Sequence, residues 1–298
     1  MIIAAVDMGG TSIKGALIRD DRMGEMIVKL VCRKNPLKSL IEFIDELVFQ
    51  VHDNSCIIDA IAIASAGRID SERGVVLYAS PNIPNWTGTP LAKILSERYK
   101  TPCFVLNDAR AAALGEARIR NVDNLVMLTI GTGLGGGIIV NGKLIHGVHY
   151  EAGEIGHTIL KPNGRSCNCG KRGCAEQYIS MRVLHRYSGI KDRRQLLEMF
   201  QKQEERVIRA VERMCEDLAV LVDKLFLTLD PSLVVIGGGF SELGPYALEI
   251  LRKKAEPYAS RSLYNTSQIE LSMLKNEAGM IGAAIYAQEK LSGVVNCD

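Results

Sequence analysis

Residues 6–18 read VDMGGTSIKGALI, and residues 129–140 read TIGTGLGGGIIV. Each stretch consists of an apolar strand, a glycine turn and a second extended segment, which is the pattern of a strand followed by a hairpin partner. Further strand and helix patterns follow in both halves of the chain. The repetition predicts two similar α/β halves that join near residues 110–120. Because hairpins come first and crossovers later, we expect mixed sheets rather than purely parallel ones.

The spacing of apolar residues predicts the main elements between these stretches. Apolar residues three or four apart predict helices, and short apolar runs that end at glycine or proline predict buried strands. Asn141-Gly142 lies between two apolar runs and predicts a hairpin turn. The expected helices cover residues 38–51, 91–100, 109–119, 204–229, 243–256 and 278–291. The expected strands include residues 58–67, 102–108, 125–130, 232–239 and 268–274, and residues 80–90 are expected to form a loop.

Composition and charge limit the classes of partner. The 298 residues carry a formal net charge of only +2, so nucleic acid and anionic membranes are not expected as partners. The N-terminal MIIAAVDMGG has no basic leader, and Asp7 interrupts its apolar run, so a signal peptide is not expected. No stretch reaches the roughly 18–20 apolar residues of a membrane helix. We therefore expect a cytoplasmic protein whose thiols stay reduced.

Glycine-rich turns follow buried strands at three places. They are Gly9-Gly10, Gly131-Thr132-Gly133 and Gly237-Gly238-Gly239. Glycine adopts positive φ and leaves backbone N–H groups unobstructed, so such turns can surround phosphate oxygens. Near the first turn, Asp7 could organise Mg²⁺ through water, while Thr11 and Lys14 could contact phosphate. Any one of these turns is explained equally well as a tight turn, but three of them at strand ends favour nucleotide binding.

Residues 131–136 also satisfy the GxGxxG pattern of dinucleotide-binding folds, and Glu151 follows Gly131 by twenty positions. In such a fold the glycines open a helix, whereas residues 138–145 have the pattern of a hairpin. We therefore expect no dinucleotide fold. The chain also lacks GxxxxGK[ST], which excludes a P-loop nucleotide site.

Asp108 lies where a predicted strand meets a predicted helix, at the edge of the sheet where α/β folds bind ligands. Its carboxylate could accept the proton of an attacking hydroxyl during phosphoryl transfer. Aspartate is also among the best helix N-cap residues. The residues alone leave both interpretations open.

His157, Cys167, Cys169 and Cys174 fall within eighteen residues, in a segment that also carries Glu154 and Glu176. One imidazole and three thiolates match the number and type of ligands in a structural zinc site. Buried thiols with a surface histidine, or a redox cluster, are the alternatives. A complete shell of four protein ligands leaves no open position, so the metal is expected to be structural.

These motifs together resemble those of the ROK sugar kinases, which belong to the actin/hexokinase/Hsp70 superfamily. DMGGTSIKG (7–15) is similar to the first phosphate motif of the family and IGTGLGGG (130–137) to the second. GEIGH (153–157) with SCNCGKRGCAE (166–176) is similar to its zinc and sugar signature. The resemblance spans nearly the whole chain. It implies two actin-like (ribonuclease H-like) α/β domains with mixed sheets flanking a cleft, namely residues 1–115 plus 283–298, and residues 116–282 with a zinc loop at 157–174.

The resemblance also implies a role for each matched residue. Asp108 would be the general base that deprotonates the sugar hydroxyl. The sugar would be bound by Asn82, Asn107, Asp108 itself, Glu154, His157 and Glu176, with His157 holding zinc through its other ring nitrogen. The phosphates of ATP and Mg²⁺ would be held by Asp7, Gly9, Gly10, Thr11, Lys14, Gly131, Thr132 and Gly133. The adenosine would lie against Gly238 and Gly239, and the protein would form a homodimer.

Two segments depart from the family pattern. SAGRID (65–70) has Ala66 where the family commonly has proline. VHYEAGEIGH (148–157) replaces a stretch of small residues with His149, Tyr150 and Glu151. This bulkier set is expected to alter the mouth of the sugar pocket, although Glu151 could equally be a solvated surface charge.

The expected activity is ATP-dependent transfer of the γ-phosphate to a hexose-type hydroxyl, most simply the 6-OH of glucose or a related hexose. N-acetylmannosamine, a β-glucoside, allose and fructose are alternative acceptors within the family. An alternative of a different class is a sugar-sensing ROK regulator or a sugar-binding protein without catalysis. Such regulators carry an N-terminal helix-turn-helix, whereas here the first strand is expected from residue 2.

Overall fold

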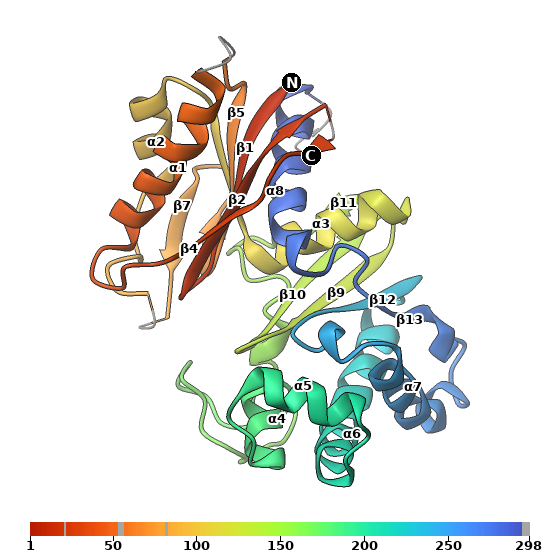
Figure 1. The fold of residues 1–298 in the computed structure, drawn as a ribbon. Helices are drawn as coiled ribbons and strands as arrows, with labels where there is room; N and C mark the ends of the chain where they lie inside the picture. The colour runs from red at the N-terminus through yellow and green to blue at the C-terminus, as the bar shows by residue number, and fades with distance from the viewer. Residues whose placement is uncertain (21, 53–56, 81–82, 294–298) are drawn as a thin grey trace. The chain divides into compact units, whose positions relative to one another are not determined.

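The computed structural model describes residues 1–20, 22–52, 57–80 and 83–293 (Figure 1). By compactness the chain divides into two units. The first comprises Met1–Gly115, His146–Glu151 and Glu277–Asp298, and the second Glu116–Ile145 and Ala152–Asn276. Compared with the expected ranges, the final return to the first unit begins at Glu277 instead of residue 283, and the short segment His146–Glu151 packs with the first unit.

The first unit contains a mixed sheet with strand order β3-β2-β1-β5-β8, and β4 also pairs with β2. β1 and β2 are antiparallel, whereas β1, β5 and β8 run parallel. The strands are β1 (Ile2–Met8), β2 (Ser12–Arg19), β3 (Arg22–Met23), β4 (Ile27–Leu30), β5 (Ala60–Ser65) and β8 (Cys103–Asn107). A separate hairpin joins β6 (Arg68–Asp70) to β7 (Val75–Tyr78).

Side-chain size explains how helices cover this sheet. α1 (Pro36–His52) and α2 (Leu91–Tyr99) lie along one face, where Leu40, Phe43 and other large apolar side chains form the core (Figure 1). α8 (Ala278–Leu291) packs on the sheet against β5, whose alternate residues Ala60, Ala62 and Ala64 are fully buried. Small side chains allow this close approach. α3 (Asp108–Arg120) follows β8 directly.

The second unit repeats the arrangement with strand order β11-β10-β9-β12-β13. β9 and β10 are antiparallel, and β9, β12 and β13 run parallel. The mixed sheets expected from the sequence are therefore confirmed in both units. The strands are β9 (Leu125–Ile130), β10 (Leu134–Val140), β11 (Lys143–Leu144), β12 (Leu233–Gly238) and β13 (Ile269–Leu271).

Helices and short 3₁₀ turns complete the second unit. Its core contains the predicted apolar face of the long helix α6, including the buried Val211, Leu218 and Leu225. The helices are α4 (Met181–Ser188), α5 (Arg193–Gln201), α6 (Glu205–Leu229) and α7 (Pro245–Ala259). The 3₁₀ turns η1 (Ile155–His157) and η2 (Ala175–Gln177) lie in the cysteine-rich segment.

Two local expectations need correction or addition, and a third is confirmed. Gly135–Gly137 lie within β10, because the strand begins at Leu134, directly after the turn. The hairpin β6–β7 and the helices α4 and α5 were not predicted. Asn141 and Gly142 form the predicted turn between β10 and β11, both with positive φ (50° and 74°).

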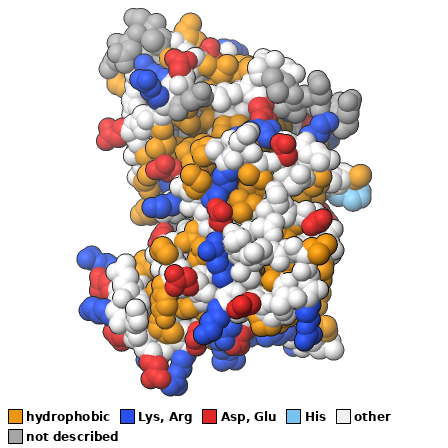
Figure 2. Space-filling view, turned by 90° about the vertical axis from the view of Figure 1, so that its right-hand side faces the viewer, with side chains coloured by type: hydrophobic (Ala, Val, Ile, Leu, Met, Phe, Trp, Pro, Cys, Tyr) orange, Lys and Arg blue, Asp and Glu red, His pale blue; other side chains and the backbone are white. Residues whose placement is uncertain are grey.

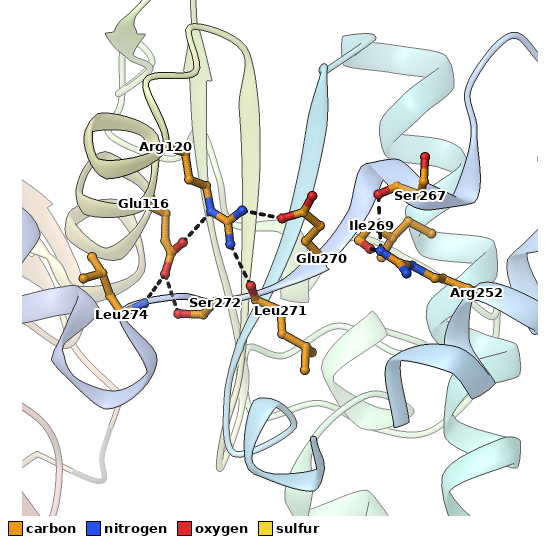
Figure 3. Close-up of polar contacts among 9 residues, drawn as sticks. All are labelled: Glu116, Arg120, Arg252, Ser267, Ile269, Glu270, Leu271, Ser272 and Leu274. Carbon is orange, nitrogen blue, oxygen red and sulfur yellow. Dashed lines mark hydrogen bonds and ion pairs between the residues drawn. The ribbon is translucent and has the colours of Figure 1, made fainter. Parts of the chain in front are cut away.

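A buried polar network ties the C-terminal part of α3 to the segment after β13 (Figure 3). The carboxylate of Glu116 is fully buried and accepts hydrogen bonds from the Ser272 hydroxyl (2.5 Å), the Leu274 N–H (2.9 Å) and Arg120 Nε (2.8 Å). Arg120 also donates to the carbonyl oxygen of Leu271 and pairs with Glu270. Because every partner is hydrogen-bonded, these buried charges hold residues 116–120 against the segment that follows β13, within the second unit.

Surface charge agrees with the small net charge. On the face drawn in Figure 2, acidic and basic side chains are interspersed. Among the described helices, none has the length and apolar content that crossing a membrane requires.

Candidate functional site

The first group of predicted site residues lies at one edge of the sheet in the first unit. Met8 of β1 pairs with Ser65 of β5, which pairs with Asn107 of β8. The three parallel strands therefore end together, and Asp7 and Asp108 lie near that common edge. This is the edge where open α/β sheets bind ligands.

Asn107 and Asp108 share a hydrogen-bond network. The Asn107 amide donates to the carbonyl oxygen of Gly67 (2.9 Å) and to Asp108 Oδ1 (2.9 Å), which also accepts the N–H of Ala109 (2.8 Å). Asn107 Oδ1 accepts the N–H of Arg110 (3.1 Å), which is the bond that an N-cap residue makes. The capping contact considered for Asp108 is therefore made by Asn107, and the Asp108 carboxylate is held in a defined orientation.

The first glycine turn connects β1 to β2. Gly9 N–H bonds to the carbonyl oxygen of Ser12 (3.0 Å), which closes the turn. Asp7 and Lys14 face each other across the antiparallel pair and form an ion pair of 3.0 Å, with both side chains mostly buried. Lys14, predicted to contact phosphate, thus lies against the carboxylate predicted to organise Mg²⁺. Of the other residues predicted for this region, Asn82 lies outside the described residues.

The remaining glycine turns lie side by side in the second unit. Ile130, which ends β9, pairs with Gly238 of the neighbouring parallel strand β12. The turn Gly131–Gly133 is closed by a bond from Gly131 N–H to Gly133 O (2.9 Å), and Gly238 adopts a positive φ of 71°. Two glycine-rich backbone turns therefore meet at one sheet edge, where few side chains obstruct backbone N–H groups that could bind phosphate.

Glu176 is packed directly against the second glycine turn. Its Oε2 accepts the N–H of Leu134 (3.1 Å), and a Cβ added to Gly133 would overlap this oxygen. Its Oε1 accepts a hydrogen bond from Nη2 of Arg182 (3.0 Å). Nε of the same arginine donates to the carbonyl oxygen of Thr132 (2.6 Å). Glu176 is buried, and its carboxylate is engaged on both oxygens.

The four predicted metal ligands converge. The ligand atoms of His157, Cys167, Cys169 and Cys174 all lie within 4.8 Å of one another. Cys169 and Cys174 Sγ are 3.5 Å apart, and Cys167 Sγ is 3.8 Å from His157 Nδ1. A tetrahedral ion with metal–sulfur bonds of roughly 2.3 Å separates its sulfur ligands by roughly 3.8 Å, so the cluster fits a four-coordinate site.

The loop geometry explains this convergence. Positive φ values at Gly170 (89°) and Gly173 (84°) reverse the chain between the cysteines. Burial and contacts with neighbouring cysteines raise the pKa of the Cys174 thiol to about 12. A divalent cation would offset this penalty, because it favours the thiolate form. His157 directs Nδ1 toward the cysteines, so its Nε2 is the nitrogen left for a ligand, and Glu154 is the N-cap residue of the same η1 turn.

The two segments that depart from the family pattern meet in the first unit. Arg68, in SAGRID, forms an ion pair with Glu151 (2.6 Å). Arg110 Nη2 donates to the carbonyl oxygen of Tyr150 (2.5 Å), a residue with a positive φ of 53°. Glu151 is half-exposed but paired, and its partner Arg68 directly follows Gly67, whose carbonyl oxygen accepts a hydrogen bond from Asn107.

Sequence reasoning missed the arginines of the site. Arg68, Arg110 and Arg182 each bond a group close to a predicted site residue. Arg110 lies one helical turn after Asn107, which is the one signal that could have suggested it. Arg68 and Arg182 gave no signal, because Glu151 and Thr132, which they contact, are distant in sequence.

Comparison with known proteins identifies a common family. The model of the ROK family matches residues 3–290. A glucokinase from Thermotoga maritima is 33% identical over 319 residues, covering 98% of this chain and 98% of that protein. An N-acetylmannosamine kinase from Haemophilus influenzae is 31% identical over 295 residues, covering 96% and 95%.

Solved structures show the same fold. A ROK family glucokinase from Streptomyces griseus, in complex with glucose and AMPPNP, has a TM-score of 0.85 and 28% identity, covering 97% of this chain and 100% of that one. A ROK family transcriptional regulator has a TM-score of 0.82 and 24% identity, covering 98% of this chain and 79% of that one. At that identity the second likeness concerns the fold alone.

Proposed function

This chain belongs to the ROK family, and from that premise we propose that it is an ATP-dependent kinase that phosphorylates a hexose-type hydroxyl. The observation that carries the proposal is the contact between Glu176 and the second glycine turn. Glu176, which is predicted to bind the sugar, lies against the backbone of the turn that is predicted to bind phosphate. A sugar hydroxyl and a terminal phosphate would meet next to such a contact.

Asp108 is the proposed general base. Hydrogen bonds from Asn107 and Ala109 orient its carboxylate, which would accept the proton of the sugar hydroxyl as the phosphoryl group is transferred in line. Asp108 is the first residue of α3, where the helix N-terminus interacts favourably with a negative charge. The glycine turns would position the phosphates through backbone N–H groups, and Mg²⁺ bound with ATP would supply compensating charge near Asp7.

Zinc is the proposed metal of the His157 and cysteine cluster, in a structural role. Four protein ligands complete a tetrahedral shell, so the metal would fix the loop and the orientation of His157. Glu154, His157 and Glu176 would then bind sugar hydroxyls. We also expect a homodimer, which light scattering would detect.

The similarity to a glucokinase and an N-acetylmannosamine kinase makes glucose and N-acetylmannosamine the first acceptors to test. Fructose, allose and a β-glucoside complete the panel, and kcat/KM is compared with a coupled assay of ADP release. At least one sugar should support ADP release that depends on that sugar. A regulator or a non-catalytic binding protein would bind sugar without releasing ADP, and that result would refute the proposal.

A further inference from the structure

Arg182 spans two parts of the second unit that have separate proposed roles. It is the second residue of α4, and its Nε donates to the carbonyl oxygen of Thr132 in the second glycine turn (2.6 Å). Its Nη2 donates to Oε1 of Glu176, the proposed sugar ligand (3.0 Å). One rigid guanidinium group therefore holds both partners at fixed spacing.

The surrounding backbone makes this connection tight. The Met181 N–H bonds to the carbonyl oxygen of Gly131 (2.9 Å), and the second oxygen of Glu176 accepts the N–H of Leu134. The segment from Glu176 to Arg182 is thus bonded to residues on both sides of Thr132 and to Thr132 itself. The Glu176 carboxylate is packed so closely against Gly133 that a Cβ added there would overlap its Oε2. A shift of the carboxylate would therefore also change its contacts with this turn.

Charge gives the connection a second consequence. The side chain of Glu176 is 11% exposed, and it lies beside a turn proposed to bind an anionic triphosphate. An uncompensated carboxylate there would repel the nucleotide. Arg182 supplies the compensating positive charge, although its own side chain is 48% exposed and the interaction is partly screened by solvent.

We propose that Arg182 is a positioning residue that couples sugar binding at Glu176 to nucleotide binding at the second glycine turn. The inference rests on the proposed kinase function and adds a residue to it. Because Glu176 and Thr132 share the Arg182 guanidinium group, a change in the hydrogen bonding of Glu176 when sugar binds would be transmitted to the glycine turn, and nucleotide binding at the turn would act on Glu176 in the same way.

Calorimetry on the zinc-loaded protein tests the coupling. The Kd of a non-hydrolysable ATP analogue is measured with and without the sugar that has the highest kcat/KM. In the wild-type protein, saturating sugar should tighten analogue binding by at least about fivefold, within the usual range of site–site coupling. In Arg182→Ala the ratio of the Kd values without and with sugar should fall toward one. In Arg182→Lys the ratio should be intermediate, because lysine keeps the positive charge but lacks the several N–H donors of a guanidinium group.

The matched control is Arg194→Ala. Arg194 pairs with Glu198 on the surface of α5 and is 89% exposed, so its removal should leave the coupling factor unchanged. Zinc content and circular dichroism verify the fold of each variant. If Arg182→Ala does not fold, Arg182→Gln replaces it, since glutamine keeps a donor for Thr132 and removes the charge.

A second variant separates charge from simple support of the loop. Arg182→Ala leaves the Glu176 carboxylate uncompensated and should weaken analogue binding without sugar. Adding Glu176→Gln removes that charge, so analogue binding without sugar should recover by roughly threefold to tenfold while sugar affinity stays low. A wild-type protein without coupling, an unchanged coupling factor in Arg182→Ala, or no recovery in the double variant would each overturn the inference. An active kinase with such results would leave the proposed function standing, whereas absence of sugar-dependent ADP release would refute the proposed function itself.

Discussion

Replacing Glu116 by alanine tests the buried polar network of the second unit (Figure 3). The carboxylate accepts three hydrogen bonds, one of them from Arg120, whose side chain is only 8% exposed. Removing one partner of a buried ion pair costs about 3–5 kcal/mol, because the other charge is left uncompensated. For a unit of this size that corresponds to a fall in Tm of roughly 10 °C. Glu116→Gln keeps one acceptor and should cost about 2 kcal/mol.

The control for this experiment is Glu270→Ala, which removes the half-exposed partner of Arg120 and should cost less than about 1 kcal/mol. Unfolding in urea is followed by circular dichroism and by fluorescence. The one tryptophan, Trp86, lies in the first unit, so its fluorescence reports that unit while circular dichroism reports both. Glu116→Ala should shift the circular dichroism transition more than the fluorescence transition. Equal losses of stability in Glu116→Ala and Glu270→Ala would refute the reasoning.

Further outcomes are expected from the metal, from pH and from packing. Elemental analysis should find about one zinc per chain. Removing the zinc with a chelator should weaken sugar binding and lower Tm together. Metal-free protein with full activity would contradict this expectation. Burial, with Arg110 and Lys290 nearby, lowers the pKa of His146 to about 4. In the unfolded chain the pKa is about 6.5, so the neutral imidazole contributes fully to stability above pH 6.5, and this contribution is lost as the pH falls toward 4. His146→Gln should therefore make the free energy of unfolding less dependent on pH between about 4 and 6.5. In Gly156→Ala the new methyl group would overlap the carbonyl oxygen of Leu134, so activity and stability should both fall, and wild-type values would show that the two loops are not packed together.

Sequence patterns predicted those elements whose own residues determine their burial. The apolar face of α6 and the alternating alanines of β5 are examples, because every third, fourth or second residue meets the core. Strands β6 and β7 have only three and four residues, too few for a period to be recognised. Contacts outside the hairpin stabilise it, such as the bond from the Val76 N–H to the carbonyl oxygen of Thr89 (3.0 Å), and no local pattern predicts them.

The same distinction applies to the candidate site. The metal cluster was predicted because its ligands lie within one short segment and carry a recognisable chemistry. The bond between Arg182 and Thr132 joins residues 50 positions apart, and an arginine on a surface helix has no feature that marks its partner. The pair Arg68–Glu151 joins two segments that each departed from the family pattern, yet only the fold shows that they meet.

The measurement that tests the central claim most directly is the activity of Asp108→Asn. Asparagine keeps an Oδ1 that can accept the bonds from the Asn107 amide and the Ala109 N–H, so a residue that only stabilises the start of α3 would tolerate the change. As a matched control, Asp192→Asn alters a carboxylate that caps α5 through the N–H of Gln195 (2.7 Å) and should leave activity unchanged. We predict that Asp108→Asn lowers kcat by roughly 10²–10⁴-fold while the Kd of the sugar changes little. Near-normal kcat in Asp108→Asn would contradict the account.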